Sequence, residues 1–153
     1  DVDQNIHLKH LGPEPLSNKF NSGYFKNYIK GKERTIKNLL MDQKFISGLG
    51  NIYVNEILFF SGVRPAKKIK KLTNFEIQKI IKFSKKIISK AIVLGGSSIK
   101  DFSSSSGKKG SFQQHFSVYG KKGKKCIKKN CSGIIKKIII SNRSTFYCNK
   151  CQK

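Results

Sequence analysis

Apolar residues in the first two thirds of the chain recur with helical spacing. The longest such stretch begins at Thr73 and ends before Gly95-Gly96, with isoleucines on one side and lysines on the other. Thr73 and Glu76 have the spacing of a capping box, which fixes the predicted start of this helix. Three shorter helices are predicted over residues 17–29, 35–41 and 51–61. The last of these is apolar almost all round, so we expect it to be buried.

A glycine-containing turn, Ser47-Gly48-Leu49-Gly50-Asn51, separates the second and third predicted helices. Glycine adopts positive φ angles and leaves neighbouring backbone N–H groups uncovered. Immediately before a helix, such groups form an anion-binding site. We therefore predict that Gly50 and Asn51 bind phosphate. The alternative interpretation of Asn51 is a helix N-cap, and the two roles are compatible because both use the same helix end.

The remaining segments are predicted to be irregular or extended. Residues 1–16 contain Gly12-Pro13-Glu14-Pro15, which cannot lie inside a helix, and residues 97–111 form a loop rich in serine and glycine. Residues 112–119 are interpreted as an extended segment. Near the C-terminus, β-rich stretches at 134–140 and 144–147 meet at Ser141-Asn142-Arg143 and predict a hairpin.

The charge of the chain narrows the class of partner. Thirty-two Lys and Arg residues against eight acids give a formal charge of +24 over 153 residues, which favours a polyanion such as nucleic acid. The alternative is that the positive charge only reflects a lysine-rich composition and does not indicate a polyanionic partner. No apolar run reaches the roughly 18 residues of a membrane-spanning helix, so we expect no membrane partner. The first residue is Asp1 rather than Met, which suggests a piece of a longer chain.

Four cysteines form two pairs, Cys126 with Cys131 and Cys148 with Cys151, with 16 residues between the pairs. This arrangement predicts a tetrahedral site for one structural zinc ion, which would stabilise a hairpin too small to bury its own core. Two disulfides or four free thiols are the alternatives. Arg143 would lie at the tip of this hairpin, where a rigidly held arginine can enter a groove or bind a phosphate.

Several motifs follow one another along nearly the whole chain. They are Leu11–Leu16, Leu40–Gln43, Gly48–Tyr53 with Glu56, Gly95-Gly96 with Lys100–Phe102, Val118–Gly120, and Arg143–Gln152. In this order they resemble the formamidopyrimidine-DNA glycosylase (Fpg/Nei) family of bacterial base-excision repair enzymes. The resemblance implies a mainly α fold with a small β zinc hairpin: a helix-two-turn-helix domain over 17–118, with a base-closing loop at 97–111, and a zinc-ribbon-like finger over 119–153. Residues 1–16 would be a linker from an N-terminal β-sandwich.

The same resemblance implies roles for individual residues. Gly50, Asn51, Arg34 and Lys37 would hold phosphates that flank the damaged nucleotide. Arg143 would enter the DNA near the extruded nucleotide, bind its 3′ phosphate and assist the later elimination step as a catalytic residue. Lys100 lies in the loop that would close over the extruded base.

The family's nucleophile is an N-terminal proline amine on the β-sandwich, which forms an iminium with the sugar; the sequence beginning at Asp1 lacks it. We therefore expect the DNA-binding part of a bifunctional glycosylase and abasic-site lyase that excises oxidised purines, namely formamidopyrimidines and 8-oxoguanine. Its partner would be duplex DNA carrying an oxidised base or an abasic site, bound by a monomer. The resemblance also implies a cytoplasmic, nucleoid-associated bacterial protein. A stand-alone zinc-containing DNA-binding module is one alternative. A ribosome-associated zinc protein is another, although it leaves the glycine turn unexplained.

Two residues near the glycine turn receive structural interpretations. Glu56 is one of the few acids and lies one turn into the predicted buried helix, where it would satisfy buried hydrogen bonds; a role in ordering the catalytic pocket is the alternative. Tyr53 is predicted to belong to the core rather than to a contact surface.

Overall fold

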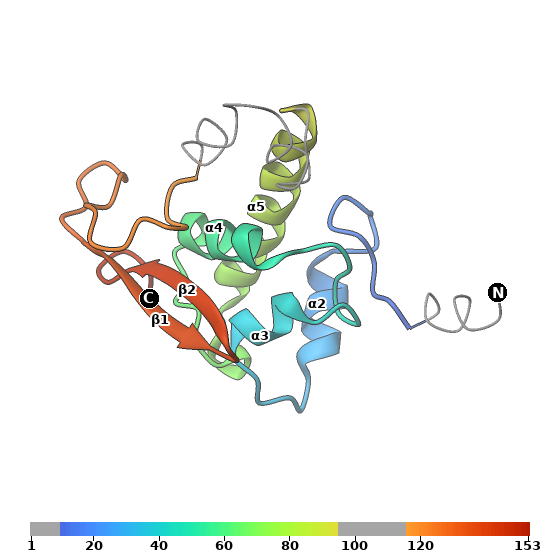
Figure 1. Ribbon diagram of the computed structural model, residues 1–153. Helices are drawn as coiled ribbons and strands as arrows, with labels where there is room; N and C mark the ends of the chain where they lie inside the picture. Colours follow the sequence, from blue (N-terminus) through green and yellow to red (C-terminus); the bar gives the residue numbers. More distant parts are fainter. Residues whose placement is uncertain (1–9, 95–115) are drawn as a thin grey trace.

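The computed structural model describes residues 10–94 and 116–153 (Figure 1). It confirms the predicted fold class, a mainly helical structure with one two-stranded antiparallel hairpin. The elements, in chain order, are α2 (Ser22–Ile29), α3 (Ile36–Met41), α4 (Asn51–Ser61), the short 3-10 helix η1 (Ile69–Lys71), α5 (Asn74–Val93), β1 (Ile135–Ile140) and β2 (Arg143–Cys148). Within the described ranges, no helix is both long and apolar enough to span a membrane.

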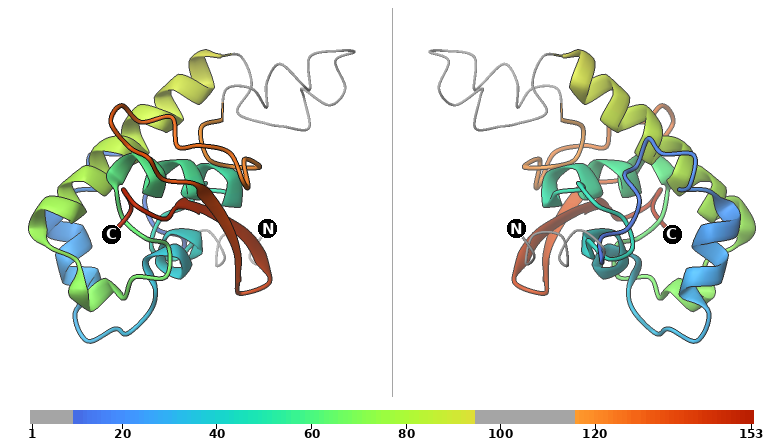
Figure 2. Two further views of the ribbon diagram at one scale, coloured as in Figure 1. Left: turned by 90° about the vertical axis from the view of Figure 1, so that its left-hand side faces the viewer. Right: turned by 90° about the vertical axis from the view of Figure 1, so that its right-hand side faces the viewer.

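Helix α4 is the central element of the fold. Figures 1 and 2 show it between the long helix α5, the short helix α3 and the β hairpin. Its side chains are apolar on almost every side, and seven of its residues are buried, among them Val54, Ile57 and Leu58. The prediction of a buried helix over 51–61 is therefore confirmed, because each face of α4 has a partner to pack against.

The helix ends show where sequence signals are sufficient and where they are not. Helix α5 begins with the predicted capping box, since the Thr73 hydroxyl accepts from Glu76 N and the Glu76 carboxylate accepts from Thr73 N. Helix α2 begins later than predicted, at Ser22 rather than near Ser17. The Asn21 side chain accepts from Tyr24 N and caps α2, so the residues before it form turns instead of helix.

The hairpin pairs Ile135 with Cys148 at its base and Ile140 with Arg143 at its end. The connecting turn is only two residues, Ser141 and Asn142, and both have positive φ angles of 50° and 65°. Two residues of this kind match the type I′ turn, whose twist fits that of the flanking strands. The placement of Arg143 within the turn was therefore wrong by one position, because Arg143 is the first residue of β2.

The hydrophobic residues form two clusters, and α4 contributes to both. The larger cluster fills the space between the helices. The smaller one lies in the finger, where Phe59 of α4 packs with Val118, Ile135, Phe146 and the cysteines. The finger therefore shares its core with the helical part of the molecule rather than having a core of its own.

Two connecting segments differ from the sequence-based picture. Residues 10–16 are irregular, as predicted, but they are tied to the α3–α4 connection: Gly12 N donates to Gln43 O and Ser47 N donates to Pro13 O. The extended segment predicted over 112–119 is wrong for its described part, since residues 117–119 form bends and a turn. Its first residues, 112–115, lie outside the described part of the chain.

Candidate metal centre and nucleic-acid interface

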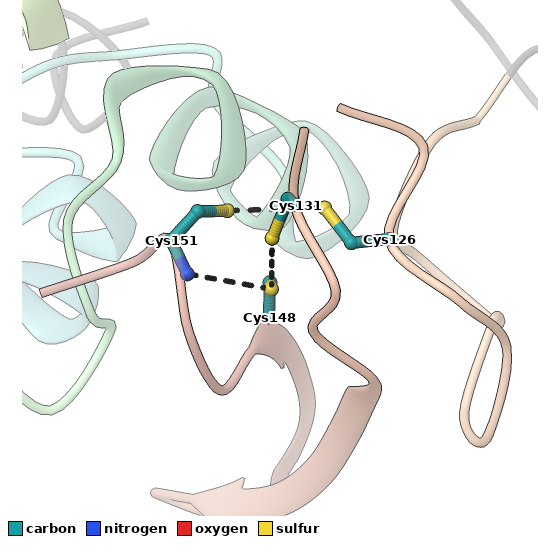
Figure 3. Close-up of side chains that lie close together, drawn as sticks. All are labelled: Cys126, Cys131, Cys148 and Cys151. Atoms are coloured by element: carbon teal, nitrogen blue, oxygen red, sulfur yellow. Dashed lines mark hydrogen bonds between the residues drawn. The ribbon is translucent and has the colours of Figure 1, made fainter. Parts of the chain in front are cut away.

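Two cysteines lie before β1, and the other two lie at the end of β2 and in the turn after it; the four sulfurs lie within 4.8 Å of one another (Figure 3). Cys126 Sγ and Cys151 Sγ are 3.8 Å apart, and Cys131 Sγ and Cys148 Sγ are 3.6 Å apart. A tetrahedral zinc site with Zn–S bonds of about 2.3 Å has sulfur–sulfur separations of about 3.8 Å. The cysteines therefore suit one structural zinc ion, as predicted from their spacing.

The loop backbone donates hydrogen bonds to two of the sulfurs, and around Cys148 it favours the thiolate form. Gly133 N donates to Cys131 Sγ at 3.4 Å, and Lys150 N donates to Cys148 Sγ at 3.4 Å. Burial raises the pKa of the Cys148 thiol, but hydrogen bonds from the backbone of Cys151 and Lys150 outweigh it and lower that pKa to about 7. Gly133 has no room for a side chain, because a Cβ atom there would overlap Cys148 Sγ.

Helix α4 binds the edge of β2 that does not pair with β1. Asn51 Nδ2 donates to Ser144 O at 3.0 Å, and Asn55 Oδ1 accepts from Phe146 N at 2.6 Å. The two amide side chains lie one helical turn apart. They bond to backbone groups of β2 that would otherwise need a third strand as partner. Asn51 is not the N-cap of α4: the cap position is Gly50, and Asn51 is the first helical residue. The start of α4 and Arg143, which precedes Ser144, consequently lie on the same side of the molecule.

Helix α3 also bonds to the hairpin. Lys37 Nζ donates to the Thr145 hydroxyl at 2.9 Å, and that hydroxyl donates to Arg143 O at 3.1 Å. Ser141 Oγ also donates to Asn38 Oδ1 at 3.0 Å. Burial, together with the nearby positive charge of Arg143, lowers the pKa of Lys37 to about 8. Lys37 is only 1% exposed, whereas the side chain of Arg143 is exposed.

The other predicted DNA-binding residues differ in how freely they can contact a ligand. Arg34 is bound by Asp42, at 2.5 Å, and by the backbone oxygen of Asn38. Gly50 is exposed and would accept a Cβ atom without contact within 4 Å, so the backbone at the start of α4 is open to a ligand. Lys100 lies outside the described residues. The roles of these residues in DNA binding stay predictions.

Glu56 holds the chain where it returns after residue 115. One carboxylate oxygen accepts from Ser117 N at 2.7 Å, and the other accepts from Val118 N and Tyr119 N, both at 2.9 Å. Burial raises the pKa of this carboxyl, and the three N–H donors oppose that rise. The prediction that Glu56 satisfies buried hydrogen bonds is confirmed.

Sequence reasoning missed the residues that join the finger to the helical domain. Gln152 Nε2 donates to Val63 O, Gln152 Oε1 accepts from Cys148 N, and Arg64 donates to Gln152 O and Asn149 O. Lys128 Nζ donates to Phe59 O at the end of α4. Gln152 directly follows the last cysteine, which was the one available signal. These bonds fix the metal-binding loops against α4.

Comparison with protein families agrees with this architecture. Residues 11–103 match the "Formamidopyrimidine-DNA glycosylase H2TH domain", and residues 123–153 match the "Zinc finger found in FPG and IleRS". Among curated proteins, the chain is 41% identical over 152 residues to a formamidopyrimidine-DNA glycosylase of Ruegeria pomeroyi, covering 99% of this chain and 54% of that protein. It is 45% identical over 145 residues to that of Proteus mirabilis, covering 95% and 52%.

Solved structures give the same result. The Lactococcus lactis Fpg in complex with DNA containing an abasic site has a TM-score of 0.83 and 36% identity, covering 99% of this chain and 55% of that one. The Fpg (MutM) protein of Thermus thermophilus has a TM-score of 0.81 and 31% identity, covering 99% and 57%. The chain thus spans about half the length of the relatives it matches. It belongs to the formamidopyrimidine-DNA glycosylase family, of which it contains the H2TH domain and the zinc finger.

Proposed function

We propose that this chain is the damaged-DNA-binding part of a bifunctional DNA glycosylase and abasic-site lyase that removes oxidised purines. The observation that carries the proposal is the bond from Asn51 Nδ2 to Ser144 O, at 3.0 Å. It joins the exposed start of α4 to the strand that begins with Arg143. One duplex can therefore reach both groups at once.

Each of the two groups offers donors suited to phosphate. The first turn of α4 has free backbone N–H groups and the positive end of the helix dipole. The Asn51 amide has a second hydrogen in addition to the one given to Ser144. Arg143 presents a guanidinium that can bind two phosphate oxygens together. We assign Gly50, Asn51 and Arg143 to direct contacts with the backbone around the lesion.

The relatives support the choice of ligand. Lactococcus lactis Fpg has been solved with abasic-site DNA and with DNA containing Fapy-dG, an oxidised purine. With Arg143 next to the extruded nucleotide, its positive charge would stabilise the phosphate that leaves during elimination. Arg34 and Lys100 would complete the cationic surface around this site, and the protein would bind as a monomer.

Fluorescence anisotropy with a labelled duplex tests the proposal. The duplex contains a stable abasic-site analogue, and the control duplex is undamaged. We expect log Kd to change with log salt by a slope of about 4 to 7 in magnitude if five to eight phosphates are neutralised. Arg143→Gln should weaken binding and make the slope shallower by about 0.9, the contribution of one phosphate.

The control variant is Arg64→Gln, which removes an arginine that binds the finger backbone rather than the proposed DNA surface. It should leave the salt slope unchanged. An affinity that is insensitive to salt, or an Arg143→Gln protein that binds both duplexes as tightly as the parent, would refute the proposed interface.

A further inference from the structure

Lys37 cannot reach a ligand from where it lies. Its side chain is 1% exposed, and its ammonium donates to Thr145 Oγ1 at 2.9 Å. The three ion pairs among the described residues involve Arg34, Lys67 and Lys70, so in this part of the chain Lys37 has no carboxylate partner. A buried cation without a counter-charge is unfavourable.

The partner of Lys37 leads directly to Arg143. The Thr145 hydroxyl accepts from Lys37 and donates to Arg143 O at 3.1 Å. Accepting a bond from a charged ammonium polarises the hydroxyl and strengthens the bond that it donates. This bond adds to the pairing with Ile140 in holding the Arg143 backbone. Thr145 itself is fully buried, so it cannot contact DNA either.

The hairpin turn makes this support necessary. Ser141 and Asn142 have positive φ angles, and Arg143 is the first residue after them, at the free end of a two-stranded hairpin. Two-stranded hairpins are marginal alone, and their ends fray. Side chains from α3 and α4 bond to residues 141, 144, 145 and 146. Arg143 is paired with Ile140 in the hairpin, and its backbone oxygen also accepts from the Thr145 hydroxyl.

We propose that Lys37 and Thr145 are positioning residues that hold Arg143 in its DNA-binding orientation, and that Lys37 acts through Thr145 rather than by binding a phosphate. This inference rests on the proposed function, because it assumes that Arg143 binds DNA. It differs from the role that family resemblance gave Lys37, and it assigns a role to Thr145, which sequence reasoning had not singled out.

A double-mutant cycle separates the two roles of Lys37. The variants are Lys37→Met, which keeps the length and packing of the side chain, and Thr145→Val, which keeps its shape and removes the hydroxyl. We expect each to weaken binding to the abasic-analogue duplex about three- to tenfold, the range for one net hydrogen bond. The double variant should bind the duplex as tightly as the single variant of lower affinity, because both changes break the same chain of hydrogen bonds. Thr145→Ser retains the hydroxyl and should restore affinity to within about twofold of the parent.

Two further readouts exclude a merely structural effect. Lys37→Met should leave the salt slope unchanged, and it should have no effect on affinity in the Arg143→Gln background. Circular dichroism and zinc content establish that each variant is folded before binding is measured.

The outcomes are distinct. Lys37→Met could make the salt slope shallower by about 0.9, with the fold-losses of affinity of Lys37→Met and Thr145→Val multiplying in the double variant. In that case Lys37 binds a phosphate directly and the inference is overturned. If neither single variant changes affinity while Arg143→Gln does, the bond to Thr145 has no positioning role. If Arg143→Gln itself has no effect, the proposed function fails first.

Discussion

Replacing Lys37 by methionine should stabilise the protein at neutral pH, although it removes a hydrogen bond. Lys37 is buried beside Arg143, and these surroundings lower its pKa from an ordinary value of 10.5 to about 8. One pKa unit corresponds to about 1.4 kcal/mol, so keeping the charge buried costs the folded protein about 2–3 kcal/mol after allowance for local relaxation. Losing the bond to Thr145 costs about 1 kcal/mol. The free energy of unfolding should therefore rise by about 1–2 kcal/mol, which raises Tm by about 3–6 °C.

The pH dependence gives the sharper test, and its sign follows from the direction of the shift. Below pH 8, Lys37 is charged in both the folded and the unfolded protein, and the folded state bears the full cost. Between pH 8 and 10.5 the folded state releases the proton first, so the unfolded state binds more protons and stability rises with pH. The advantage of Lys37→Met should consequently shrink across this range.

Lys37→Arg provides the matched control, because a guanidinium stays charged throughout. Urea unfolding at several pH values gives the free energy of unfolding of each protein. The difference between the parent and Lys37→Arg should be constant near pH 7, and near pH 10 it should have shifted by about 2–3 kcal/mol in favour of the parent. The titration of the other lysines is common to all three proteins and cancels. A constant difference between the parent and Lys37→Met from pH 7 to 10 would refute this account of the buried charge.

Three further changes test other parts of the structure. Gly133→Ala should reduce bound zinc below one ion per chain, because its Cβ atom would overlap Cys148 Sγ. The control Gly23→Ala, at an uncrowded position in α2, should still bind one zinc ion per chain. Equal zinc content of the two variants in metal analysis would contradict the geometry. Asn55→Ala should lower the free energy of unfolding by about 1–3 kcal/mol in urea titrations, since it leaves the buried Phe146 N–H without its acceptor, whereas Asn55→Asp keeps an acceptor and should lose less. Glu56→Gln places an amide group against three N–H donors and should increase amide hydrogen exchange at residues 117–119; unchanged exchange there would show that the carboxylate is not what holds this segment.

The elements that sequence could predict are those whose signals are local. Helix α5 has a capping box and a regular apolar stripe, and α4 lies between two glycines, so their bounds were close to correct. The zinc ligands were predictable because cysteine pairs at this spacing have few other uses. The start of α2 was missed because Ser17 and Asn21 are both acceptable caps, and only packing decides between them.

The parts of the site that could not be predicted depend on partners far apart in the chain. Lys37 lies on what the sequence shows as the polar side of a short helix, yet its partner, Thr145, is 108 residues away. Nothing in the local sequence indicates that the hairpin covers this lysine. Likewise, Asn51 has the appearance of an N-cap, and only the docking of β2 explains why its amide turns toward Ser144.

The two asparagines of α4 also have a consequence for the solubility of the chain. They bond to the outer edge of β2. A strand of another molecule therefore cannot pair with this edge, as it could with an open one. The strand on the other side, β1, contains three consecutive isoleucines. If the hairpin detaches from α4, it exposes an unpaired strand edge next to an apolar strand. We therefore expect the protein to aggregate on losing this attachment, before the helices themselves unfold.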